Sequence, residues 1–320
     1  MAHDGYRFFV RVWNAGLPPH GPSPRVAVSL RDASASLGET RPRAGPLGRV
    51  FFLHGIVSHG GWYESSCVRI AEAGFEVHFL DRRGSGLNAA ARGDVDSPDT
   101  WVRDVADYID SASRDRRPAI LAGISWGGKL ALAVARRHPG LIHGLALICP
   151  GVFSKFGAGW LERWAVGLAS RTPARRRRVA IPLQDSHLFT DDPSWQRWIE
   201  RDPLVLRRLT VRAARANWEL GQYAENADNV PAIPILLMLA GRDRIIDNAR
   251  TREFFGHLAS PQKRLVEYPE AAHTFEFGPA RQTYVDDFID WCGRAMGNAP
   301  AECSVQEIGS DPKKFVEWVT

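Results

Sequence analysis

The sequence predicts an α/β protein with a doubly wound, mostly parallel sheet and an inserted helical cap. Three observations support this fold class. Short apolar runs recur along the chain, each ending in Gly, Asp, Pro or Ser, and helical segments lie between them. One long stretch without a convincing strand interrupts this alternation. The chain has 320 residues, 44% of them hydrophobic, so it can bury a full core, as one large α/β domain or as two small ones.

The expected strands are apolar on both faces, which is typical of the buried strands of a parallel sheet. An opening strand is predicted at residues 6–13, and a further one within 25–30. Six more follow, in the runs GRVFFLHG, FEVHFLD, PAILAGIS, HGLALICP, IPILLMLAG and KRLVEYPE. Helices are predicted within 61–74, 97–114, 126–140 and 279–297, the second with Ser97 as its N-cap and Pro98 as its first residue.

The alternation divides the chain into a core and a cap. Residues 1–150 and 232–297 form the expected core, with a loop-rich insert at 16–48. Residues 151–231 are predicted to be a helical cap without strands, and five tryptophans lie in it. The tail, residues 298–320, is expected to carry a short helix over 311–319, packed on the outside of the core.

Ser125 is the candidate nucleophile, because the motif Gly-Ile-Ser-Trp-Gly lies between an expected strand and an expected helix. A nucleophile elbow requires this strand–turn–helix context: the flanking glycines relieve crowding, and the serine oxygen is raised above the sheet edge. The alternative, a serine that caps a helix in an ordinary turn, explains fewer of these features.

A serine nucleophile needs a base, and the base needs a carboxylate that orients it. Asp243 follows an expected strand by two residues beyond Gly241, and His273 lies in the loop after the next strand. His257 is the other histidine beyond Asp243, but its segment is predicted to be helical. Asp247 competes with Asp243 for the role of the acid, and we favour Asp243.

Two backbone N–H groups are the candidate oxyanion donors. One belongs to Trp126, the residue after the serine, and the other to Ile56, in the glycine-rich loop HGIVSHGGWY after an expected strand.

Five stretches together resemble the monoacylglycerol lipases and bacterial lysophospholipases of the α/β-hydrolase superfamily. They are HGIVSHGGWY, LDRRGSGLN, GISWGG, LAGRDRIID and EAAHTFEF, and the resemblance covers roughly residues 47–296. It implies an α/β-hydrolase fold, a triad of Ser125, Asp243 and His273, and an oxyanion hole at Ile56 and Trp126. The chain departs from the pattern at Val57, where the family has glycine, and at Asn88, where serine is usual.

The resemblance implies a serine carboxylic-ester hydrolase that acts on lipid-like acyl esters and needs neither metal nor organic cofactor. A thioesterase, a C–C hydrolase and an acyltransferase use the same triad and remain alternatives, as does a non-catalytic ligand-binding relative. Dehalogenases and epoxide hydrolases of this fold use a carboxylate nucleophile, so Ser125 argues against both. The sequence leaves acyl chain length and oligomeric state open.

Charge and cysteine content limit the expected partners and location. The net charge of +5 is spread along the chain apart from Arg175–Arg178, which no nucleic-acid motif accompanies. We therefore expect no nucleic-acid partner, and at most transient contact of these arginines with lipid surfaces. Four dispersed cysteines, no signal peptide and no apolar run of about 18 residues favour the cytoplasm.

Overall fold

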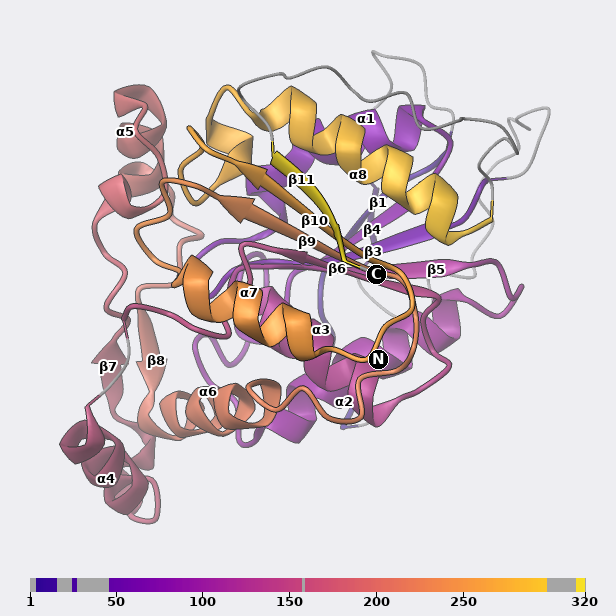
Figure 1. Ribbon diagram of the computed structural model, residues 1–320. Coiled ribbons are helices and arrows are strands. Elements are labelled where there is room, and N and C mark those ends of the chain that lie inside the picture. Colours follow the sequence, from indigo (N-terminus) through magenta and orange to yellow (C-terminus); the bar gives the residue numbers. More distant parts are fainter. Residues whose placement is uncertain (1–3, 16–24, 28–45, 157–158, 298–314, 320) are drawn as a thin grey trace.

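A computed structural model describes residues 4–15, 25–27, 46–156, 159–297 and 315–319 (Figure 1). A large twisted sheet runs through the molecule, and helices cover both of its faces. Most of the predicted insert at 16–48, and most of the tail before residue 315, lie outside the described residues.

The large sheet has nine strands in the order β11-β10-β9-β6-β5-β3-β4-β1-β2. The six central strands, from β10 to β4, pair in parallel; β1, β2 and β11 pair antiparallel with their neighbours. The strands are β1 (Val10–Trp13), β2 (Arg25–Ala27), β3 (Arg49–Leu53), β4 (Glu76–Leu80), β5 (Ala119–Ile124), β6 (Gly144–Ile148), β9 (Ile235–Ala240), β10 (Lys263–Tyr268) and β11 (Phe315–Val319). All eight predicted strands are confirmed.

Two groups of helices cover the two faces of the sheet. Helices α1 (Glu64–Glu72) and α8 (Arg281–Ala295) lie on one face, and α2 (Pro98–Ala112), α3 (Trp126–Arg137) and α7 (Asn248–His257) lie on the other (Figure 1). The predicted start of α2 is confirmed: the Ser97 side chain accepts from the Thr100 N–H, and Pro98 is the first helical residue. Strands β3, β5, β6 and β9 are buried along their whole length, because helices cover them on both sides.

The segment between β6 and β9 lies beyond the carboxyl edge of the sheet, and we call it the β6–β9 segment (Figure 1). It contains α4 (Trp160–Ala169), α5 (Pro193–Arg201), α6 (Val211–Ala224) and the short 3-10 helices Pro173–Arg176 and Ser186–Leu188. It also contains a two-stranded ribbon, β7 (Arg178–Ala180) with β8 (Arg208–Thr210), so the prediction of a strand-free stretch was wrong. Each strand has only three residues, which is too short to produce a visible alternation of apolar and polar side chains.

The chain end also differs from the prediction. Residues 315–319 form β11, which pairs antiparallel with β10, and no helix is found there. Phe, Val, Trp and Val in this stretch favour a strand, and β10 would otherwise present an unpaired edge. Within the described ranges, no helix combines the length and the apolar character needed to cross a membrane.

Candidate active site

Ser125 lies in a sharp turn between β5 and α3, with backbone angles φ 55° and ψ −120°. Such a positive φ strains a residue with a side chain by roughly 1–3 kcal/mol. The turn is held in place because the Ser125 N–H donates to the Ile148 carbonyl at 2.9 Å, and the Ser125 carbonyl accepts from Gly128 and Gly151. The predicted strand–turn–helix placement of Ser125 is therefore present in the structure.

The flanking glycines are required by close backbone contacts. A Cβ at Gly123 would lie 2.5 Å from the Gly127 carbonyl oxygen, and one at Gly127 would lie 2.2 Å from the Leu53 carbonyl oxygen. Both contacts involve backbone atoms, so a side chain at either position would force strands or helix apart. These two glycines thus let the tight turn pack directly on the end of β3.

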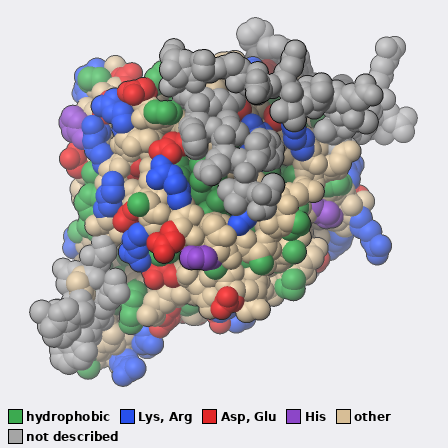
Figure 2. Space-filling model, in the orientation of Figure 1, with side chains coloured by type: hydrophobic (Ala, Val, Ile, Leu, Met, Phe, Trp, Pro, Cys, Tyr) green, Lys and Arg blue, Asp and Glu red, His purple; other side chains and the backbone are tan. Residues whose placement is uncertain are grey.

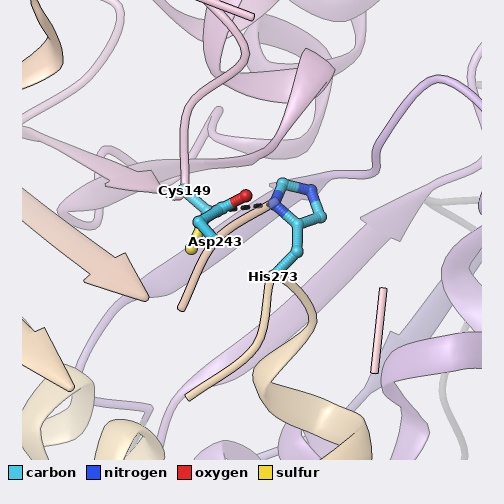
Figure 3. Close-up of side chains that lie close together, drawn as sticks. All are labelled: Cys149, Asp243 and His273. Atoms are coloured by element: carbon cyan, nitrogen blue, oxygen red, sulfur yellow. Dashed lines mark hydrogen bonds and ion pairs between the residues drawn. The ribbon is translucent and has the colours of Figure 1, made fainter. Parts of the chain in front are cut away.

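Asp243 and His273 form the hydrogen bond that the sequence predicts, with 2.8 Å between Asp243 Oδ2 and His273 Nδ1 (Figure 3). Both residues are buried, with 6% and 4% of their surface exposed. The other carboxylate oxygen, Oδ1, accepts from the N–H groups of Ile245 and Ile246 at 2.7 and 2.9 Å. Three donors therefore fix the orientation of the Asp243 carboxylate.

The surroundings of Asp243 favour its charged form. Burial alone would raise the pKa of this carboxyl group, but the adjacent His273 ring and the two N–H donors outweigh burial and hold the pKa below its usual value. Asp243 is therefore a carboxylate at neutral pH, which can orient the His273 ring and stabilise an imidazolium.

Asp247, the competing acid, has a different task in the structure. It is the N-cap of α7, where its side chain accepts from the Arg250 N–H at 3.1 Å. No contact between Asp247 and His273 is found among the described residues.

Ser125 and the Asp243–His273 pair lie along one edge of the sheet, because β5, β6, β9 and β10 are parallel neighbours that end there. Within the described part of the chain, Ser125 Oγ makes no hydrogen bond with His273. Such bonds are often long in the absence of substrate and shorten in the substrate complex.

The two predicted oxyanion donors flank the serine from different elements. Gly55 lies directly against Ser125, since a Cβ placed on it would be 3.7 Å from Ser125 Oγ, and the Ile56 N–H follows it. The Trp126 N–H is the first of α3. Neither N–H finds an acceptor among the described residues, so both are free to bind a negatively charged oxygen.

Cys149 was not predicted to belong to the site. It follows β6, and its sulfur, an Asp243 oxygen and a His273 nitrogen lie within 4.8 Å of one another (Figure 3). Burial, together with the Asp243 charge, raises the pKa of the thiol well above its usual value, so Cys149 stays protonated. A metal ion needs a thiolate, and His273 Nδ1 is already engaged by Asp243. These three residues therefore do not suit a metal ion.

Asp202, at the end of α5, connects the β6–β9 segment to the loop that carries Ile56. Its Oδ2 accepts from His59 Nε2 and from Trp62 Nε1, both at 2.8 Å. Leu206 N–H donates to the Val57 carbonyl nearby, at 2.9 Å. Sequence reasoning missed this connection, because the partners are at least 140 residues apart.

An aromatic cluster lies next to His273, where the β6–β9 segment meets the core. Trp195 stacks on Phe277 at 4.6 Å between ring centroids, and Trp62 packs against Phe277 at 5.1 Å. Phe189 contacts both Trp62 and the His273 ring, at 5.8 and 6.1 Å. The His273 ring therefore contacts this aromatic cluster through Phe189.

The sheet order and the strained seryl turn define an α/β-hydrolase. A family model described as serine aminopeptidase, S33, matches residues 44–279, well over half of the chain. The chain belongs to this family and is a serine hydrolase, as the sequence predicts.

Relatives of known name share most of the length of the chain. Monoacylglycerol lipase of Mycolicibacterium smegmatis is 28% identical over 255 residues, which cover 78% of this chain and 89% of the lipase. Human monoglyceride lipase is 32% identical, covering 73% of this chain and 77% of its own. The solved monoacylglycerol lipase of Paleococcus ferrophilus superimposes with a TM-score of 0.69 at 23% identity, over 80% of this chain and 96% of that one. This last likeness shows the fold alone.

Asp243→Asn should lower kcat by about 10³-fold or more, because a neutral amide cannot stabilise the imidazolium and favours the wrong tautomer. Asp247→Asn should change kcat less than about threefold, because asparagine caps helices as well as aspartate does. Steady-state kinetics on an activated ester measure both variants. If the two lose activity in the reverse order, Asp247 is the acid.

Proposed function

We propose that Ser125, His273 and Asp243 form the triad of a hydrolase that cleaves lipid-like acyl esters. His273 takes the proton of Ser125, whose oxygen attacks the ester carbonyl, and the N–H groups of Ile56 and Trp126 bind the resulting oxyanion. The alcohol leaves with the proton from His273, and water then releases the acid by the reverse transfer. The buried Asp243–His273 hydrogen bond, beside a strained serine at the same sheet edge, is the observation that carries this proposal.

The substrate class rests on the relatives and on the rings near His273. Two of the relatives are named monoacylglycerol or monoglyceride lipases, and a third, 27% identical over 74% of this chain, is a phospholipase of Bacillus subtilis. Ligand pockets are mostly apolar, with a few polar groups at the reacting atoms. We therefore assign the aromatic cluster to the acyl chain, and residues 151–231 of the β6–β9 segment to a cap over the core. The protein's expected location remains the cytoplasm.

Ser125→Ala should lower ester kcat by at least about 10³-fold without unfolding the protein, because the covalent step is lost. His273→Ala should lower ester kcat by about the same factor. The double variant should lose little more than either single one, since triad residues act as a unit. Losses that multiply in the double variant would contradict the triad, and thermal unfolding checks that each variant is folded.

The value of kcat/KM should rise with acyl length from C2 until the pocket is full, by nearly fourfold per methylene, or about 0.8 kcal/mol. Trp198 also packs on Trp195 and Phe277, so Trp195→Ala with Trp198→Ala should flatten this rise. Trp291→Phe should leave it unchanged, because the Trp291 ring lies at Gly144, the first residue of β6, at the opposite edge of the sheet. A series of p-nitrophenyl esters measures the slope. Preference for acetyl esters in all three proteins would contradict a lipid-like substrate, and faster cleavage of aminoacyl p-nitroanilides would favour a peptidase.

We further propose that the cap contacts anionic lipid surfaces. Arg175–Arg178 are all exposed, and the exposed apolar side chains of Leu168 and Val179 lie close to them in the chain. Elsewhere, on the face drawn in Figure 2, basic and acidic side chains are interspersed. Four adjacent cations beside apolar groups favour an anionic interface, and salt screens this attraction.

Replacing Arg175–Arg178 by glutamine should reduce co-sedimentation with vesicles containing phosphatidylserine, because the local positive charge is lost. The matched control removes four dispersed cations by the same substitution at Arg69, Arg117, Arg252 and Arg294. Equal binding by the two variants, or binding insensitive to salt, would count against the proposal.

A further inference from the structure

Arg82 is a buried arginine next to the candidate oxyanion hole. It is the second residue after β4, directly following Asp81, and only 6% of it is exposed. Its backbone is fixed on both sides: the Arg82 N–H donates to His54 Nε2 at 3.1 Å, and its carbonyl accepts from Asn88 Nδ2 at 3.0 Å. The Arg82 backbone is therefore held in place, with its side chain between the loop of Ile56 and the start of α3.

The Arg82 guanidinium binds the loop of Ile56 through two consecutive carbonyls. One nitrogen donates to the Gly55 carbonyl at 2.9 Å, and the other donates to the Ile56 carbonyl. Burial and the Arg82 charge hold the pKa of His54 well below its usual value, so the ring is neutral. Since His54 Nε2 accepts from Arg82, its Nδ1–H donates to the same Gly55 carbonyl, at 2.8 Å.

These contacts set the direction of the Ile56 N–H. In a trans peptide the C=O and the following N–H lie in one plane and point in opposite directions, and the described peptide bonds are all trans. Two donors on the Gly55 carbonyl therefore orient the plane that carries the Ile56 N–H. Without them, rotation of this peptide would turn the N–H away from the serine.

The same guanidinium also contacts Trp126, whose N–H is the second candidate oxyanion donor. It lies 4.5 Å above the centre of the Trp126 ring, in a cation–π arrangement. The Trp126 ring is held from two further sides, by Trp101 at 4.9 Å between centroids and by Asn217 of α6, which accepts from the indole N–H at 2.6 Å. One side chain thus bridges the two residues whose N–H groups are the candidate donors.

The charge of Arg82 has no carboxylate neutralising it by direct contact among the described residues. The neighbouring Asp81 is engaged instead by Arg11 at 3.0 Å and by the N–H groups of Gly60 and Leu87. Burial lowers the pKa of Arg82 to about 9, so the group remains cationic at neutral pH. In the described part of the chain the guanidinium contacts only neutral groups, including the His54 ring and the Gly55 and Ile56 carbonyls, so its charge leaves a positive field at the site.

We propose that Arg82 is the positioning residue of the oxyanion hole, which aligns the Ile56 and Trp126 donors and adds a positive field there. The proposal rests on the proposed function, since it takes these two N–H groups as the oxyanion donors. Arg82 acts through its neighbours. Because negative charge develops on the carbonyl oxygen only as Ser125 attacks, this alignment lowers the barrier and contributes little to binding of the uncharged ester.

The test compares Arg82→Met with Arg83→Met in the full chain. Arg83 is a matched control, because it is adjacent, similarly buried and stacked on a ring, 4.1 Å above Tyr6, but its hydrogen bonds go to Asp4 and Asp104. Kinetics on a p-nitrophenyl ester give kcat and KM. A trifluoromethyl ketone, whose adduct with serine carries an oxyanion, reports on the hole directly, and thermal unfolding reports on the fold.

Arg82→Met should lower kcat by about 10- to 10²-fold with KM nearly unchanged, and should weaken binding of the ketone by a similar factor. This loss is smaller than that expected when an oxyanion donor is removed altogether. Arg83→Met should lower the melting temperature and leave kcat within about twofold. Arg82→Lys keeps the charge but cannot bind two carbonyls in the same geometry, so an intermediate loss is expected. If Arg82→Met does not fold, Arg82→Lys still tests the proposal.

Wild-type kcat and ketone affinity in Arg82→Lys or Arg82→Met would overturn the proposal, as would a loss seen only in KM. Ser125→Ala separates this failure from that of the proposed function. If Ser125→Ala is inactive and the Arg82 variants are not impaired, only the role of Arg82 is wrong. If Ser125→Ala keeps full activity, the triad itself is wrong.

Discussion

The positive φ of Ser125 is the constraint on which the rest of the structure depends. A serine rarely adopts this conformation, so its surroundings must hold it there. Two kinds of feature do so: hydrogen bonds from neighbouring backbone to the seryl turn, and glycines that let the turn pack on the end of β3. The same close packing brings Gly55 against the serine, and the first N–H of α3 has no acceptor among the described residues, as expected at a helix start. The strain and the proposed oxyanion hole thus both originate in one turn.

Charge is arranged around this turn with the two signs on separate elements. Asp243, beyond β9, is held as a carboxylate that faces the His273 ring, and Arg82, beyond β4, is held as a cation between Gly55 and Trp126. No direct ion pair joins these two groups, so neither cancels the field of the other at close range. One charge can stabilise the imidazolium and the other the oxyanion, which is the charge distribution that ester hydrolysis creates.

The sequence predicted the core well, because each buried parallel strand is an apolar run ended by a turn residue, and because the positions of Ser125, Asp243 and His273 depend on where those strands end. It failed where structure depends on distant partners. Residues 315–319 form a strand by pairing with the edge of β10, and the three-residue strands β7 and β8 pair with each other. Cys149 directly follows β6, and Arg82 is the second residue after β4, so their positions near strand ends could have been noticed in the sequence. Their contacts with the site, however, join different strands, and no regular spacing along the chain reveals such contacts.

The most direct measurement of the central claim is identification of the residue that reacts with a fluorophosphonate. The strained turn and the Asp243–His273 pair should make Ser125 far more nucleophilic than any other serine of the chain. Peptide mass spectrometry of the labelled protein should find a single adduct, on the peptide that contains Ser125, and Ser125→Ala should abolish it. An adduct on another residue, or an unlabelled protein that still hydrolyses esters, would contradict the account.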